Sequence, residues 1–124
     1  MTRIKEPIFI TSLIEVEVLN AIQLRVFRRN VTAQGANTAK LAFEQDVVSG
    51  VVGVHPLPVA TFEIAKRLSS KHTATLGTRG FDLVHVAAAL ALDATAFLSF
   101  DQNQRKLAQA AGLTLQPRSL AHLQ

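Results

Sequence analysis

The sequence predicts an α/β fold in which a parallel sheet is covered by helices on both faces. Short apolar segments alternate with helical segments along the 124 residues, an order that is typical of parallel sheets. Hydrophobic residues make up 48% of the chain and charged residues 18%, so the chain can bury a core. At this length, we expect one domain that spans residues 1–124.

Each element is predicted from its local pattern. Ile8–Ile10 follows a proline and is expected to form a buried strand. Thr11 and Ser12 are good helix N-caps, and Glu15 stands at capping-box spacing, so a helix should follow to about Arg29. One face of this helix is expected to carry Leu13, Val16, Asn20, Leu24 and Phe27.

The later elements follow from caps, breakers and apolar runs. Thr32 is a candidate cap for the second helix, whose first turn Gly35 weakens. Small residues at 87–91 let a helix lie close against a sheet, and Gly112 ends the last helix. We expect helices at 32–48, 59–70, 78–92 and 102–111, strands at 51–54, 95–100 and 113–115, and a loop at 71–77.

Composition excludes several classes of function. The chain has no cysteine, which removes disulfides, cysteine nucleophiles and thiolate metal sites. It has no Trp or Tyr, so only Phe is left to stack on single-stranded nucleic acid. A formal net charge of +4 permits attraction to phosphate without demonstrating it. The polar N-terminus and the lack of a long apolar run predict a cytoplasmic protein with no membrane partner.

Three carboxylates have settings that suggest chemistry. Glu17 lies in the first helix among apolar residues, Asp82 begins the Ala-rich helix, and Asp101 ends an apolar strand. Ligands bind beyond the carboxyl ends of parallel strands, and converging carboxylates suit Mg²⁺ or Mn²⁺. Each carboxylate also has a simpler interpretation: Asp82 stabilises a helix N-terminus, Asp101 caps the next helix, and Glu17 is a solvated helical residue.

His85 lies three residues after Asp82 and therefore on the same helical face. Such a pair can ligate a metal, although a histidine on an apolar helix is more often a core residue. The sequence contains no Gly-rich phosphate loop, HExxH, GxSxG or CxxC motif.

Three segments carry motifs whose residue types, order and spacing agree with one family. Residues 11–21 place Glu17 in an ExxNA pattern, residues 76–87 read LGTRGFDLVHVA, and residues 97–101 read FLSFD, with Leu-Ala and Gly-Leu pairs after them. Over roughly residues 7–115, this order resembles the PIN-domain family, the metal-dependent ribonucleases that include the VapC-type toxins of toxin–antitoxin pairs.

The resemblance implies a PIN-like three-layer α/β/α sandwich with an acidic cleft that holds one or two Mg²⁺ or Mn²⁺ ions. By position, Glu17, Asp82 and Asp101 match three of the family's acidic residues, which bind the metal and serve catalysis. Ser99 matches the Thr or Ser that precedes the last Asp, and Arg79 and His85 match positions with supporting roles. A cognate antitoxin protein and an RNA substrate are the implied partners.

The sequence departs from the family at its beginning. PIN domains open with a hydrophobic strand that carries the first catalytic Asp, and this chain begins where the second strand would be. We therefore expect an N-terminally truncated sandwich in which residues 8–10 pair with 95–99 or a second chain fills the gap, hence a homodimer. Asp93 is a poor substitute for the missing ligand, and Glu15 is a nearer one. A late start codon, a truncated chain and a genuine short variant remain open explanations.

Two functional hypotheses follow. In the first, the three carboxylates hold Mg²⁺, which activates water to attack an RNA phosphodiester. Arg79 and the arginines at 25, 28 and 29 would then guide the RNA backbone, although those three equally suit a solvated helix end. In the second, the chain is a catalytically impaired PIN-like module that dimerises or captures an antitoxin. A dinucleotide-binding domain is disfavoured, because no GxGxxG turn is present.

Overall fold

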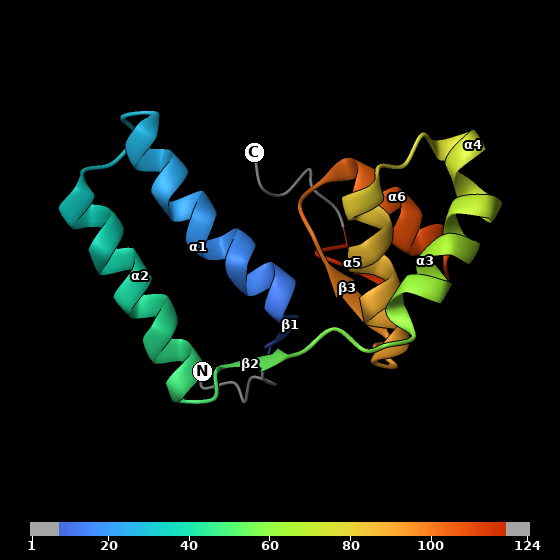
Figure 1. Ribbon diagram of the computed structural model, residues 1–124, viewed down its shortest axis with the longest axis horizontal. Coiled ribbons are helices and arrows are strands. Elements are labelled where there is room, and N and C mark those ends of the chain that lie inside the picture. Colours follow the sequence, from blue (N-terminus) through green and yellow to red (C-terminus); the bar gives the residue numbers. More distant parts are fainter. Residues whose placement is uncertain (1–7, 119–124) are drawn as a thin grey trace. The chain divides into compact units, whose positions relative to one another are not determined.

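The computed structural model describes residues 8–118, which belong to two compact units, Met1–Leu57 and Pro58–Gln124 (Figure 1). The predicted α/β class and the parallel pairing of its strands are confirmed. The first unit contains β1 (Ile8–Thr11), α1 (Ser12–Phe27), α2 (Ala33–Val48) and β2 (Val52–His55). The second contains α3 (Thr61–Leu68), the π-helical turn η1 (Ser69–Thr73), α4 (Ala74–Leu76), α5 (Gly80–Ala91), β3 (Ala96–Leu98), α6 (Gln102–Ala110) and β4 (Thr114–Gln116).

In the first unit, a pair of helices connects two parallel strands. β1 and β2 pair in register from Ile8 opposite Val52 onward. The Phe9 ring lies against its partner Gly53, where an added Cβ would stand 2.8 Å from the ring, so the ring would have to move to admit a larger residue. Of the two expected caps, Thr11 is the one used: its side chain accepts a hydrogen bond from the Ile14 amide at 3.2 Å.

The helical face of α1 that carries Leu13, Val16, Asn20, Leu24 and Phe27 is mostly exposed. Val16 is 62% exposed and Phe27 is 83% exposed, and no residue of α1 is fully buried. The partly buried side chains include Ile14, Val18 and Ile22, which are spaced four residues apart. α1 packs against α2, and this neighbour selects a different apolar stripe from the one that the sequence pattern suggested.

The second unit has a true core around α5. This helix packs against α3 and α6, and Val86 and Ala87 are fully buried in it. Small side chains allow neighbouring elements to come close to the helix axis. The buried apolar residues of this core are Ala65, Leu68, Leu83, Val86, Ala87, Phe97, Leu107, Ala108 and Leu113.

The segment between α3 and α5 differs from the expected loop at 71–77. It continues from α3 as the π-helical turn η1 and the short helix α4, and it stops at Gly77, whose φ of 66° lies in the left-handed region that glycine tolerates. α5 consequently begins at Gly80 rather than at residue 78.

Within residues 8–118, each unit contains one two-stranded sheet, and the single sheet of a PIN-like sandwich remains a prediction. β1 pairs with β2, and β3 pairs in parallel with β4 from Ala96 opposite Thr114. The expected pairing of residues 8–10 with 95–99 would join segments of different units, and it remains a prediction.

The packing of α5 can be tested by overfilling it. Ala87→Leu inserts a bulky side chain at a position with no solvent exposure, so we expect a loss of about 1–3 kcal/mol in the free energy of unfolding. Ala110→Leu, at an exposed position near the end of α6, is the matched control and should change stability by under about 0.5 kcal/mol. Urea denaturation followed by circular dichroism measures both. If Ala87→Leu were as stable as Ala110→Leu, the core around α5 would be more loosely packed than described.

Candidate functional site

Asp82 is a buried carboxylate at the start of α5. The residue is 2% exposed, and its Oδ2 accepts a hydrogen bond from the Arg79 backbone amide at 3.4 Å. The Arg79 Nε lies 3.7 Å from the same oxygen, but the Arg79 side chain is 71% exposed and contributes little to a pair of this kind. Both of these interactions involve Oδ2. Burial of a carboxylate is costly, and a nearby cation would offset that cost.

Asp101 forms the N-cap of α6 directly after β3. Its Oδ1 accepts hydrogen bonds from the amides of Asn103 at 2.8 Å and Gln104 at 3.1 Å. The simple capping role that the sequence allowed is therefore real. Within the described part of the chain, Oδ2 accepts no hydrogen bond, and the residue is exposed. Capping thus occupies one oxygen and leaves the other available to a ligand.

Ser99 stabilises the turn that contains Asp101. It is a buried residue, and its Oγ accepts from the Asp101 amide at 3.1 Å and donates to Gln104 Oε1 at 3.0 Å. Both bonds fix the backbone between β3 and α6. The structure thus brings Ser99 and Asp101 together and gives Ser99 a positioning role.

Arg105 is a residue of this turn that the sequence interpretation missed. Its guanidinium is buried, and it donates from Nη1 to the Ser99 carbonyl at 3.0 Å and from Nη2 to the Arg118 carbonyl at 3.2 Å. It therefore ties the end of β3 to the chain that follows β4. The spacing of Asp101 and Arg105, four residues apart, suggests an ordinary surface ion pair, so the pattern alone does not indicate a buried role.

Asp82 and Asp101 both belong to the second unit. Asp82 lies in the first turn of α5, and Asp101 directly follows β3. Residues of α5 and β3 contribute to one core (Figure 1).

His85 and Glu17 have different placements. His85 is 5% exposed on α5, one turn after Asp82, and its ring stacks on Phe81 with centroids 6.1 Å apart. Glu17 is an exposed residue of α1 in the first unit, whereas Asp82 and Asp101 belong to the second. The meeting of all three carboxylates accordingly remains a prediction. Residues 8–118 contain no group of three or more His, Asp or Glu side chains gathered to hold a metal ion.

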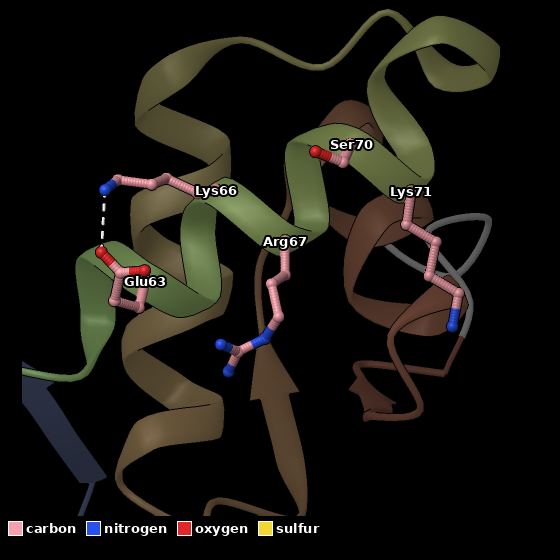
Figure 2. A pocket seen from close by; sticks show the side chains of 5 residues that line it. All are labelled: Glu63, Lys66, Arg67, Ser70 and Lys71. Atoms are coloured by element: carbon pink, nitrogen blue, oxygen red, sulfur yellow. Dashed lines mark hydrogen bonds and ion pairs between the residues drawn. The ribbon is translucent and has the colours of Figure 1, made fainter.

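The structure also contains a basic surface that the sequence interpretation did not identify. Lys66, Arg67 and Lys71 line an open hollow on α3 and η1, together with Glu63 and Ser70 (Figure 2). The sequence does contain a signal for this surface, because Lys66, Arg67 and Lys71 recur close together beside the apolar Ala65 and Leu68. The loop expected at 71–77 separated Lys71 from the helix and hid this pattern.

Comparison of the chain with protein-family models, with curated proteins and with solved structures finds no match. The resemblance to PIN domains therefore rests on the sequence motifs alone. Within residues 8–118, no helix combines the length and the apolar character that a membrane crossing requires.

The role of Arg105 predicts a specific loss of stability. Arg105→Met keeps the apolar stem but leaves the carbonyls of Ser99 and Arg118 without their donors, which should lower the free energy of unfolding by about 1–3 kcal/mol. Lys106→Met removes the same charge from the next, exposed position and should have little effect. Thermal unfolding compares the two variants, and equal melting temperatures would contradict the buried role.

Proposed function

We propose that this chain is a metal-dependent endoribonuclease of the PIN type that cleaves RNA phosphodiesters with carboxylate-bound Mg²⁺ or Mn²⁺. The proposal is supported by the burial of Asp82 in the first turn of α5 and by Asp101, which directly follows β3 and caps α6 through Oδ1. The LGTRGFDLVHVA and FLSFD motifs, which contain these two residues, support it further.

The donor set suits the proposed ions. Mg²⁺ and Mn²⁺ prefer oxygen ligands, and Asp82 and Asp101 supply carboxylate oxygens, of which Asp101 Oδ2 is engaged by no described residue. Glu17 is the proposed third ligand. When bound, the ion lowers the pKa of a water and offsets charge that develops on the phosphodiester.

The chain's own residues would hold and orient the site. Ser99 and Arg105 fix the turn that carries Asp101, and the burial of Asp82 keeps its carboxylate in one orientation. Arg79 stands at the exposed rim of α5, where it would contact the RNA phosphate. His85, whose ring stacks on Phe81 within the same helix, would have a supporting role.

Cleavage of RNA tests the proposal with a matched set of carboxylate variants. Wild-type protein should cleave RNA with Mg²⁺ and stop when EDTA is added, and Asp82→Asn and Asp101→Asn should each lose at least about 100-fold in rate. Asn retains the N-cap of α6 at residue 101, so this variant separates cleavage from stability.

Asp93→Asn is the control for this experiment. Asp93 lies before β3, at the opposite end of the strand from Asp101, and its φ of 58° is a conformation that Asn tolerates. It should leave the rate within about twofold of wild type. Equal rates for Asp101→Asn and Asp93→Asn would remove Asp101 from the mechanism.

A second candidate function is a PIN-like module that binds a protein partner without catalysis. It is favoured by the apolar side chains that the first unit leaves exposed, among them Phe9, Val16 and Phe27, since contiguous exposed apolar surface marks interaction sites. In this function, the second copy or the antitoxin would cover the first unit.

Thermal unfolding in the presence of Mn²⁺ distinguishes the two functions. An ion that binds the folded protein raises stability by RT ln(1 + [L]/Kd), which is about 2.7 kcal/mol at one hundred times Kd. We expect Mn²⁺ at millimolar concentration to raise the melting temperature of wild type and of Asp93→Asn, and to leave the Asp82→Asn/Asp101→Asn double variant unchanged. No rise in wild type would favour the noncatalytic module.

A further inference from the structure

The basic hollow on α3 and η1 differs in chemistry from the acidic residues. It has a volume of about 320 Å³ and is lined by Glu63, Lys66, Arg67, Ser70 and Lys71 (Figure 2). All five residues are exposed, and α3 buries Thr61, Ala65 and Leu68 on its other side. The cations are therefore presented to solvent by a helix whose opposite face is anchored in the core.

The charges of the hollow are not balanced. Lys66 Nζ forms an ion pair with Glu63 Oε2 at 2.8 Å. The hydrogen bond and charge of Lys66 lower the pKa of Glu63 from its usual value, so Glu63 stays ionised at neutral pH and offsets Lys66. Within residues 8–118, Arg67 and Lys71 take part in no ion pair. Their two positive charges are left facing the solvent.

Arg67 and Lys71 stand four residues apart across the junction of α3 and η1. A π turn takes more residues than the 3.6 of an α-helical turn, so side chains four residues apart remain near the same line along the axis. Figure 2 shows Arg67 and Lys71 extending from the same side of the ribbon, with Lys66 and Glu63 paired to one side of them. Turns of this kind are frequent at functional sites.

We propose that the hollow formed by Lys66, Arg67, Ser70 and Lys71 binds the phosphodiester backbone of a single-stranded nucleic acid. Arg67 and Lys71 stand about one turn apart, and Ser70 also lines the hollow, so the cations provide separate contacts for neighbouring phosphates. A chain without Trp or Tyr has few platforms for base stacking, so recognition through phosphates fits its composition. This site adds to the proposed nuclease function the surface that would hold the RNA strand. It rests on the proposed nuclease function only for the choice of RNA as the ligand.

The experiment measures binding without cleavage. A short fluorescein-labelled oligouridylate is titrated with the full chain in EDTA, and anisotropy gives the Kd. Arg67→Gln/Lys71→Gln should weaken binding about tenfold and reduce the slope of log K against log salt by about 1.4, since each neutralised phosphate of a single strand contributes about 0.7. Lys40→Gln/Lys106→Gln removes the same charge from exposed positions outside the hollow and should change Kd by less than about twofold.

Two further variants separate charge from structure. Glu63→Gln removes the only anion lining the hollow and should tighten binding about two- to threefold. Arg67→Lys/Lys71→Arg preserves both charges and should bind within about twofold of wild type, which would show that loss in the Gln pair is not a folding defect.

Two outcomes would overturn the proposal, and a third would uphold it while rejecting the nuclease function. If Arg67→Gln/Lys71→Gln and Lys40→Gln/Lys106→Gln weaken oligonucleotide binding equally, binding depends on net charge alone. Binding to vesicles that contain phosphatidylserine, lost in Arg67→Gln/Lys71→Gln, with no binding of the oligonucleotide, would assign the hollow to a lipid surface. Retained oligonucleotide binding through Arg67 and Lys71 in a protein that cleaves no RNA would uphold this site and reject the nuclease function, so the two failures are distinguishable.

Discussion

The burial of α5 is the constraint on which the second unit depends. Val86, Ala87 and Ala88 are at most 1% exposed, and their small volumes let α3 and α6 pack against this helix. A helix buried to this extent has little freedom to shift, because protein interiors are packed as densely as organic crystals. The position of Asp82 on the first turn of α5 is fixed by the same packing. The basic side chains of α3 are fixed indirectly, since that helix rests on α5.

In the turn between β3 and α6, Asp101 has a structural role and also the chemical role that we propose for it. One carboxylate oxygen of Asp101 caps α6, and the other is not engaged by the described residues. Ser99 and the buried Arg105 stiffen the same turn through its backbone. A carboxylate held in this way loses little conformational freedom on binding a cation, which favours affinity. The two interpretations of Asp101 that the sequence offered are therefore compatible.

The two units differ in how far their own residues complete a core. The second buries a cluster that includes Phe97, Leu107 and Leu113, whereas in the first α1 buries no residue and α2 buries only Ala36. Two strands and two helices rarely form an independent core. Large apolar side chains such as Phe9 and Phe27 stay exposed on the first unit, while Asp82, Asp101 and the basic hollow lie on the second.

The sequence by itself determined the α/β class, the order of the elements and the caps at Thr11 and Asp101, because these depend on local periodicity and on hydrogen bonds within a few residues. Only the tertiary structure decided which stripe of α1 is covered, that the segment after α3 is helical, and that Arg105 lies buried beneath Ser99. Each of these depends on a neighbour distant in sequence. A local pattern shows which surfaces are apolar or charged, but packing decides which of them meet.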